Sequence, residues 1–416
     1  MATVRPFKGF RPVPELAEKI ASLPYDVMDT EEARSKIAEN QYSFLTVTKS
    51  EATLPEGTDA YSDEVYAKAR ENLVNYANSG KMKQDKNPCF YIYRQRMNQH
   101  IQIGLVATAS VEEYRKGIIK RHELTRTEKE QDRVRHITET KAQTGPVFLT
   151  YKQRPEISSY ILKLMAERDP VYNFIAEDGV RNTLYVVDSP LEIREITELF
   201  SRVSAFYIAD GHHRCAGAMR VADQLANAAG KQDPEAEYEY FQAVIFPDNM
   251  MEILDYNRLV TDLAGLDVRS FIAAVQERFE IAPVQKAYHP VERHTFGMYL
   301  DGRWYKLKAK DGACDPQNAI DALDVSILQN NLLGPVLQIG DPRTDSRINF
   351  VGGIRGLAGL ERKVDGGEYA VAFSMYPTLM TEVMDIADAG QIMPPKSTWF
   401  EPKLRDGMVV HLLEDL

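Results

Sequence analysis

The stretch Phe206-Tyr207-Ile208-Ala209-Asp210-Gly211-His212-His213-Arg214 decides the fold. Its first half is apolar, aromatic and β-branched, which predicts a buried strand at residues 203–209. Small and apolar residues then recur at helical spacing over residues 215–225, and Gly230 is placed to end that helix. The stretch therefore predicts a strand, a tight turn and a helix.

The predicted turn has the features of an anion-binding site. A helix N-terminus presents unpaired N–H groups and the positive end of the helix dipole, and Gly211 carries no side chain to keep a ligand from the backbone. Arg214 adds a bidentate donor, so phosphate is the natural ligand. The same residues also fit an ordinary helix start, in which Asp210 caps the helix and His212 and His213 face solvent. Metal ligation by the two histidines is disfavoured because adjacent helical residues point in different directions.

Composition limits the class of protein. The chain has 416 residues, and its 44% hydrophobic and 27% charged residues are typical of a globular protein with a sizeable core. Lys and Arg number 50 against 61 Asp and Glu, and the net charge of -11 disfavours nucleic acid as a partner. The three cysteines form no CxxC pair, which favours a reducing compartment. With neither a signal peptide nor a membrane span in the sequence, we expect a cytoplasmic protein. The sequence leaves the oligomeric state open.

The order of predicted elements indicates an α/β fold with a mixed sheet. Strands at residues 147–151 and 241–246 alternate with helical segments on either side of the central stretch. A plausible joint follows Phe246. We therefore expect a catalytic core at residues 1–247 and a C-terminal α+β lobe at residues 248–416 that packs against the core and completes its cleft.

Two segments outside the central stretch carry candidate catalytic residues. Pro24 ends a proline-rich segment that delivers Asp26 just before a helix, where Asp26 is either a turn residue or a carboxylate held in a cleft. His122 and Glu123 precede a very polar helix predicted at residues 126–140, a suitable place for a catalytic base or a phosphate-side histidine. We interpret the polar helix as a solvated face. The segment lacks the HExxH pattern, which excludes a metalloprotease.

A second phosphate-like signature lies near the end of the chain. Residues 390–397 have the spacing of a P-loop, but Pro395 replaces its second glycine and offers no N–H to a phosphate. No helix pattern follows, so we reject the P-loop fold. Lys396, Ser397 and Thr398 supply an ammonium and two hydroxyls that either contact phosphate or form an ordinary surface loop.

Several motifs together resemble a widespread bacterial family catalogued as a domain of unknown function. They are Tyr25-Asp26-Val27, Arg121-His122-Glu123-x-Thr125, Gly145-Pro146-Val147-Phe148, Asp210-Gly211-His212-His213-Arg214 and Pro394-Pro395-Lys396-Ser397-Thr398-Trp399-Phe400. The run from Asp210 to Arg214 also resembles the signature of the free serine kinases, which are built on the ParB/sulfiredoxin-like fold. That resemblance implies a nucleotide-binding core in which the strand-turn-helix cradles phosphates and an acidic residue deprotonates the serine hydroxyl.

The anion site and the resemblance agree on an ATP-dependent phosphotransferase, a small-molecule kinase with free L-serine as the first expected acceptor. Mg²⁺ would bridge the nucleotide oxygens, His212 or His213 would donate to the transferring phosphoryl group, and Asp26 or Glu123 would act as base. The donor is ATP or ADP. The alternatives are a non-catalytic nucleotide-binding regulator and a metal-dependent phosphohydrolase.

The residues that this function would use fall into three groups. They are the phosphate-binding candidates Asp210, Gly211, His212, His213, Arg214, Lys396, Ser397 and Thr398, the catalytic candidates Asp26, His122, Glu123, His212 and His213, and the substrate-binding candidates Arg126 and Arg133.

Overall fold

The computed structural model describes residues 1–416, which divide into two compact units. Unit 1 contains Met1–Met251 and Pro402–Leu416, and unit 2 contains Glu252–Glu401. The end of the chain thus returns to unit 1, whereas we expected residues 248–416 to form one lobe. Apolar side chains account for the return, because Val410 and Leu412 are buried in a core with the N-terminal segment.

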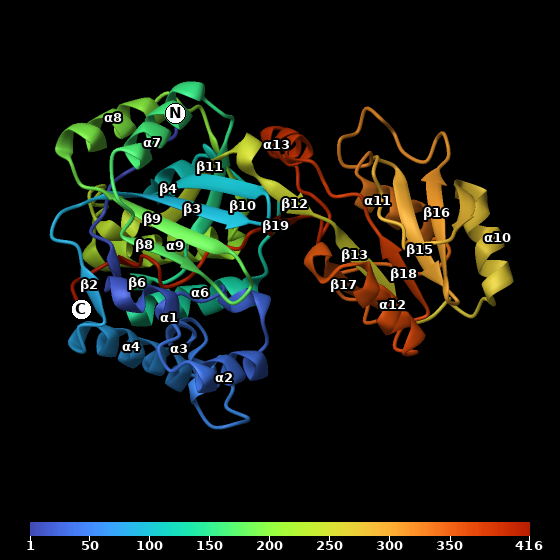
Figure 1. The fold of residues 1–416 in the computed structure, drawn as a ribbon, viewed down its shortest axis with the longest axis horizontal. Helices are drawn as coiled ribbons and strands as arrows, with labels where there is room; N and C mark the ends of the chain where they lie inside the picture. The colour runs from blue at the N-terminus through green and yellow to red at the C-terminus, as the bar shows by residue number, and fades with distance from the viewer. The chain divides into compact units, whose positions relative to one another are not determined.

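Unit 1 is built on an eight-stranded mixed sheet (Figure 1). In spatial order its strands are β5 (Ile119–Lys120), β10 (Phe206–Asp210), β7 (Val147–Tyr151), β11 (Tyr240–Pro247), β4 (His100–Ser110), β3 (Phe90–Met97), β9 (Arg181–Val187) and β8 (Tyr172–Ile175). Strand β10 runs parallel to β5 and antiparallel to β7, and β7 runs parallel to β11. The predicted α/β class with a mixed sheet is confirmed.

Helices flank this sheet (Figure 1). They are α1 (Ala17–Ile20), α2 (Thr30–Glu39), α3 (Leu45–Thr48), α4 (Asp63–Asn78), α5 (Val111–Arg115), α6 (Thr127–Thr140), α7 (Pro155–Ala166), α8 (Pro190–Phe200) and α9 (His212–Ala229). In Figure 1, α7 and α8 lie together on one side of the sheet and α2, α3 and α4 on the other. Residues such as Ile161, Phe200 and Ala218 bring α7, α8 and α9 into one core with the strands. Each large apolar side chain buried there contributes roughly 1.5–3 kcal/mol.

Short strand pairs complete unit 1. Strand β1 (Phe10–Pro12) pairs with β2 (Met82–Gln84), and β20 (His411–Leu412) pairs with β6 (Ala142–Gln143). None of the helices in either unit combines the length and the apolar character needed to cross a lipid bilayer.

The predicted strand-turn-helix is confirmed as β10, Gly211 and α9, and Gly230 follows the helix with a φ of 68°. Strands β3 and β4 form a hairpin, and the polar residues 95–97 belong to its strands. Gln95 pairs with Gln102 in the ladder, and the strands continue to a tight turn at Asn98 with a φ of 54°. Polar side chains on these strands do not mark a loop because they are buried and hydrogen-bonded.

The polar helix α6 also differs from its prediction. Arg133, His136 and Thr140 are buried, so this helix is not a solvated face. It packs between α4 and α9. The contact with α9 is close, because a Cβ on Gly217 would lie 2.9 Å from Cβ of Arg133. Arg133, His136 and Thr140 therefore face the interior of unit 1, while other polar residues of α6, such as Glu128 and Glu139, are exposed.

Unit 2 has a six-stranded antiparallel sheet and its own apolar core. Its strands are, in spatial order, β14 (Phe279–Val284), β16 (Arg303–Ala309), β15 (Thr295–Leu300), β18 (Val371–Ser374), β13 (Tyr256–Val260) and β17 (Ile348–Gly352). The helices are α10 (Val268–Arg278), α11 (Asp324–Leu328), α12 (Leu357–Asp365) and α13 (Met380–Asp388), and β12 (Glu252–Leu254) pairs with β19 (Trp399–Glu401). Asp301 and Gly302 form a tight hairpin turn with positive φ at both residues.

Candidate active site

The first turn of α9 carries the central stretch of the sequence. Gly211 precedes the helix with a φ of 98°, and a Cβ there would lie 3.4 Å from Cα of Val147. The left-handed conformation favours glycine, because other residues lose roughly 1–2 kcal/mol in it. No side chain caps this end of α9, so its first backbone N–H groups are suited to an anionic ligand.

Asp210 ends β10 at a shift in the register of its pairing with β7. Its carboxylate does not cap α9 but accepts a hydrogen bond of 2.9 Å from Nζ of Lys403. Burial alone would raise the pKa of Asp210, but Lys403 and Arg214 outweigh burial and hold that pKa well below its usual range. Asp210 is therefore an ionised carboxylate with a buried cationic partner.

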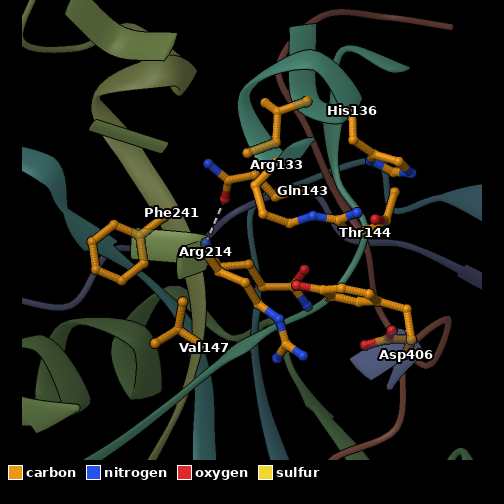
Figure 2. A pocket seen from close by; sticks show the side chains of 12 residues that line it. Arg133, His136, Gln143, Thr144, Val147, Arg214, Phe241 and Asp406 are labelled. Atoms are coloured by element: carbon orange, nitrogen blue, oxygen red, sulfur yellow. Dashed lines mark hydrogen bonds between the residues drawn. The ribbon is translucent and has the colours of Figure 1, made fainter. Parts of the chain in front are cut away.

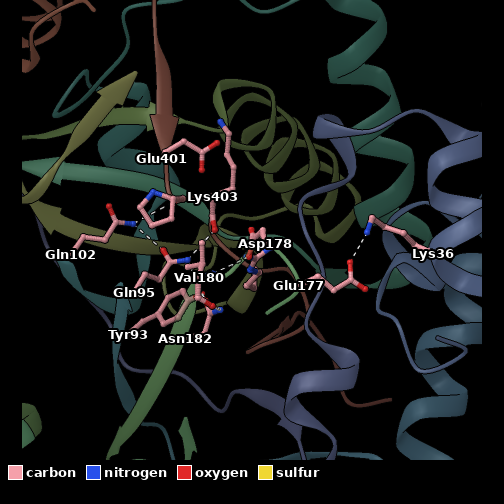
Figure 3. A network of polar contacts seen from close by, with 12 residues as sticks. Lys36, Tyr93, Gln95, Gln102, Glu177, Asp178, Val180, Asn182, Glu401 and Lys403 are labelled. Atoms are coloured by element: carbon pink, nitrogen blue, oxygen red, sulfur yellow. Dashed lines mark hydrogen bonds and ion pairs between the residues drawn. The ribbon is translucent and has the colours of Figure 1, made fainter. Parts of the chain in front are cut away.

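A polar network on the sheet holds the segment that carries Lys403 (Figure 3). Gln95 donates to the carbonyl oxygen of Lys403 at 2.9 Å, and Gln102 donates to Gln95 at 2.9 Å. Asn182 accepts hydrogen bonds from Gln95 and from Tyr93. These four side chains are buried, and the hydrogen bonds between them restrict their motion, although Oε1 of Gln102 has no partner. The sheet therefore fixes the backbone from which Lys403 reaches Asp210.

Arg214 is buried in a second group of contacts. Its Nη1 donates to the carbonyl oxygen of Pro146 at 2.6 Å, and its Nη2 lies 3.4 Å from Oδ2 of Asp26. The centre of its guanidinium is 5.5 Å from the centroid of the Tyr25 ring. The structure thus brings together three of the motifs: Tyr25-Asp26, Gly145-Pro146 and the run ending at Arg214.

Asp26 lies in a short 3-10 turn, Tyr25–Val27, directly after Pro24. Its side chain is 40% exposed, whereas that of Arg214 is 9% exposed. The ion pair therefore has a buried cation and an accessible carboxylate. Of the two interpretations of Asp26, the carboxylate beside a site fits this placement better than an isolated turn residue.

Arg133 and Arg214 line one small pocket (Figure 2). Arg133 pairs with Asp132 at 2.7 Å, and the centre of its guanidinium lies 3.8 Å from the centroid of the Tyr25 ring. Such desolvated cation–π contacts contribute up to about 2 kcal/mol each. The pocket offers about 30 Å³ to water, which is room for one or two molecules and not for a metabolite. We call Tyr25, Arg133, Arg214 and Asp406 the arginine cluster.

Asp406 contributes a carboxyl group to the same pocket. It is fully buried, and neither of its oxygens has a hydrogen-bond partner. A Cβ on Gly145 would lie 2.7 Å from its Oδ1, so this approach requires a glycine. Burial raises the pKa of Asp406 to about 7, although Arg214 acts against the rise. The carboxyl group is therefore protonated in a large share of molecules near neutral pH.

A second group of side chains meets the first turn of α9. We call it the histidine cluster, and it consists of His122, Glu123 and His212. One ligand atom from each lies within 4.8 Å of the others. The two imidazole rings meet edge to face with their centroids 4.6 Å apart. Burial lowers the pKa of His122 to about 4, against the opposing effects of Asp210 and the carbonyl of Ile208, so its ring is neutral.

The imidazoles of the histidine cluster lack hydrogen-bond partners. None of the four ring nitrogens of His122 and His212 makes a hydrogen bond of good geometry, although the carbonyl of Ile208 lies close to His122, and the residues are 2% and 5% exposed. A buried polar group without a partner costs about 1–3 kcal/mol. The protein thus retains two such side chains beside the helix N-terminus at a measurable cost in stability.

His213 connects α9 to the segment that carries His122. Its Nε2 accepts a hydrogen bond of 3.0 Å from the backbone N–H of Arg126, which leaves the proton of the neutral ring on Nδ1. Burial lowers the pKa of His213, so the neutral form is favoured. The side chain of Arg126 is 71% exposed and lies 4.0 Å from Glu128, outside both clusters.

The cluster of Lys396, Ser397 and Thr398 belongs to unit 2. Ser397 donates to the carbonyl oxygen of Pro394 at 2.6 Å, and Lys396 has a positive φ and an ammonium 5.5 Å from the Tyr256 ring centroid. These are contacts of a well-ordered loop. A role of the three residues in phosphate binding stays a prediction.

Sequence reasoning missed two residues of the site, Lys403 and Asp406. Both lie in the segment that returns to unit 1, shortly after the motif that ends at Phe400 but outside it. One signal was present, because Lys403, Arg405 and Asp406 stand beside the apolar residues Leu404 and 408–410. Charged residues within an otherwise buried segment are usually paired or functional.

The site residues from Tyr25 to Arg214 lie within the part of the chain that matches a known family. A family model described as "Protein of unknown function (DUF1015)" matches residues 4–326. The chain belongs to the DUF1015 family. This confirms the resemblance on which the sequence analysis relied, and no curated protein matches the chain.

Solved structures similar to this DUF1015 chain share little sequence with it. A conserved hypothetical protein from Pyrococcus furiosus is 15% identical, with a TM-score of 0.35 over 74% of this chain and 95% of that one. A free serine kinase in complex with AMP is 13% identical, with a TM-score of 0.33 over 71% and 86%. SbnI with a C-terminal truncation, from Staphylococcus aureus, is 10% identical, with a TM-score of 0.36 over 72% and 85%.

Proposed function

We propose that the protein is an ATP-dependent phosphotransferase that phosphorylates the hydroxyl group of a small metabolite, with free L-serine as the first acceptor to test. The observation that carries the proposal is the uncapped N-terminus of α9 after Gly211, with the carboxylate of Asp26 accessible beside it. The resemblance of residues 210–214 to the free serine kinase signature supports the same class of reaction.

The phosphates of the nucleotide would lie against the first turn of α9. Its backbone N–H groups donate to the phosphate oxygens, and the helix dipole favours their negative charge. His213 offers a further donor at Nδ1, because its Nε2 is occupied by the N–H of Arg126. Arg214 would stabilise the phosphates through its positive charge, which lies beside Asp26. All these donors are fixed before the ligand binds, which is the condition for effective electrostatic stabilisation.

Asp26 would serve as the base. As the acceptor oxygen forms a bond to the γ-phosphorus, the bond from that phosphorus to the bridging oxygen breaks, ADP leaves, and the hydroxyl proton passes to the carboxylate. We favour Asp26 over Glu123 because Asp26 is exposed and its partner Arg214 holds it in place. Glu123 lies with two imidazoles in the histidine cluster.

Mg²⁺ fits a site of this kind in part. It prefers oxygen ligands, and Asp26 and Glu123 supply carboxylates near the first turn of α9, whereas the imidazoles suit it poorly. When bound, the ion would neutralise charge that develops on the transferring phosphoryl group. Arg133 and Arg126 remain proposed contacts to an acceptor carboxylate.

The direct test is incubation of the full chain with Mg²⁺, a pool of free amino acids and sugars, and either ATP or ADP as donor. Mass spectrometry should find one new phosphorylated species, O-phosphoserine if serine is the acceptor. The absence of any phosphorylated product with both donors, with the nucleotide still bound, would leave a nucleotide-binding regulator as the better description.

Substitutions test the role of the base. Asp26→Asn removes the proton acceptor but keeps its shape, and should reduce kcat by a factor of about 10²–10⁴ with little change in nucleotide affinity. Asp169→Asn, an exposed aspartate elsewhere in unit 1, is the matched control and should keep full activity. If Glu123→Gln instead abolishes turnover while Asp26→Asn is active, Glu123 is the base.

A further inference from the structure

The histidine cluster combines features that the proposed phosphotransfer does not require. Two imidazoles and one carboxylate converge so that one ligand atom from each lies within 4.8 Å of the others. His122 enters from the segment before α6, and His212 is the first residue of α9. The cluster is therefore held by two separate elements, which fixes the distance between its members.

The burial of the imidazoles is a second and independent observation. His122 and His212 are 2% and 5% exposed, and their ring nitrogens have no hydrogen-bond partner in the protein. By contrast, the buried His411 has partners at both nitrogens, Gln143 at 3.2 Å and Glu237 at 2.8 Å. The chain satisfies a buried structural histidine where it needs one. The two imidazoles without partners indicate a ligand that is coordinated by imidazole nitrogens.

We propose that His122, Glu123 and His212 form a binding site for a divalent transition-metal ion. Two imidazole nitrogens and one carboxylate oxygen suit Zn²⁺, Fe²⁺, Co²⁺ or Mn²⁺, and they do not suit Ca²⁺ or Mg²⁺, which prefer oxygen. At metal–ligand distances of about 2.0–2.2 Å, tetrahedral ligand atoms lie roughly 3.3–3.6 Å apart, so these three atoms would need to approach one another by up to about 1.5 Å, a distance that side-chain rotation can cover.

Three protein ligands leave open positions on the ion. Sites of this kind are typical of metals that also bind water or substrate, whereas structural zinc sites use four protein ligands. The open positions would face the first turn of α9, because His212 belongs to it. Under the proposed function, a phosphate oxygen is the natural further ligand, but binding of the ion itself needs no nucleotide.

Because the ion should bind without nucleotide, its binding can be measured separately from kinase activity. The full chain, stripped of metal and without nucleotide, is titrated with Co²⁺, and visible absorption and equilibrium dialysis report binding. One equivalent should bind and give absorption bands of a nitrogen-containing coordination sphere, and Zn²⁺ should displace it. Absence of stoichiometric binding of both ions to the folded native chain would overturn the proposal, whatever the kinase assays show.

Variants locate the ion. His122→Ala and His212→Ala should each lower Co²⁺ affinity at least 100-fold, and Glu123→Gln should lower it about 10-fold to 100-fold. His411→Asn is the matched control, as a buried histidine with satisfied nitrogens, and should bind Co²⁺ as the native chain does. Equal binding by the native chain and a folded His212→Ala variant would show that the ion sits elsewhere. If the alanine variants fail to fold, the spectrum of the native chain still decides whether imidazole nitrogens ligate the ion.

Discussion

The arginine cluster and the histidine cluster both meet the first turn of α9, and they differ in how their nitrogen-bearing side chains are paired, although Asp406 in the arginine cluster is itself without a partner. In the arginine cluster, Arg214 donates to Pro146 and Asp26, and Arg133 pairs with Asp132. In the histidine cluster, the ring nitrogens have no such partners. Both are buried, so solvent does not account for the difference.

The comparison distinguishes two uses of buried polarity. Groups that are paired within the protein are already oriented, and they act on a ligand through a fixed field. Groups that are buried without partners lower stability until something binds to them. We therefore assign the arginine cluster to positioning and the histidine cluster to ligation.

Removal of the buried guanidinium should have the largest effect. Arg214→Ala takes the cation from Asp26 and from the phosphate site, and should lower kcat/KM about 10²–10³-fold, as the loss of one preorganised donor does elsewhere. Arg220→Ala, two turns further along α9 and paired with Glu130, is the control. Steady-state kinetics with ATP as donor provide the measurement. Full activity of a folded Arg214→Ala protein would contradict the positioning role.

Asp406→Asn should change how stability depends on pH. The pKa of Asp406 is raised to about 7 from an ordinary value near 3.8, so its contribution to stability is complete at low pH and is lost as pH rises through 7. The asparagine variant has no such loss, and it should gain about 2–3 kcal/mol relative to the native chain between pH 5 and pH 8. Urea unfolding at both pH values measures the gain. Parallel pH profiles would show that this carboxyl stays charged.

Two glycine substitutions test whether the backbone at the N-terminus of α9 binds phosphate. Gly211→Ala and Gly230→Ala place alanine at φ values of 98° and 68°, at the two ends of α9. Each should cost about 1–2 kcal/mol in thermal or urea unfolding. Only Gly211→Ala should also weaken nucleotide binding, about 10-fold by calorimetry. Equal nucleotide affinity of the two variants would remove the α9 N-terminus from the phosphate site.

The smallest effect is expected at Lys396, which lies outside both clusters. Its side chain is exposed, and an exposed cation contributes about 1 kcal/mol or less to the binding of an anion. Lys396→Ala should therefore weaken ATP binding less than about 5-fold, with a smaller effect as salt is added. No change at low ionic strength would remove this residue from the phosphate-binding candidates.

Local patterns predicted the local structure well. The strand, Gly211 and α9 are contiguous in sequence, and their signals of burial, positive φ and helical spacing act within a few residues. The prediction that α6 is a solvated face was wrong for its buried side, and for the opposite reason. Arg133 and His136 look like solvent-facing residues until Tyr25 and the close approach of α9 cover them. Hydrophilicity identifies polar groups but does not show whether other parts of the chain cover them.

The remaining residues of the site depend on tertiary structure that no local pattern contains. Lys403 is placed by Gln95 and Gln102, whose burial is decided by the packing of the whole sheet. The cluster of His122 with His212 likewise joins two segments whose proximity follows from the order of strands β5 and β10. Sequence reasoning singled out these histidines but disfavoured metal ligation, because that argument considered only the adjacent pair His212 and His213.

The return of the chain to unit 1 has a consequence for the order of synthesis. Unit 2 is one continuous segment between Met251 and Pro402, and β12 and β19 at its two ends pair with each other. A ribosome therefore completes unit 2 before it delivers Lys403 and Asp406. Until then, Asp210 lacks its lysine partner, and the nascent chain carries the sequence of the turn at Gly211 without Lys403 and Asp406. Unit 1 reaches its working form last, although most of it is made first.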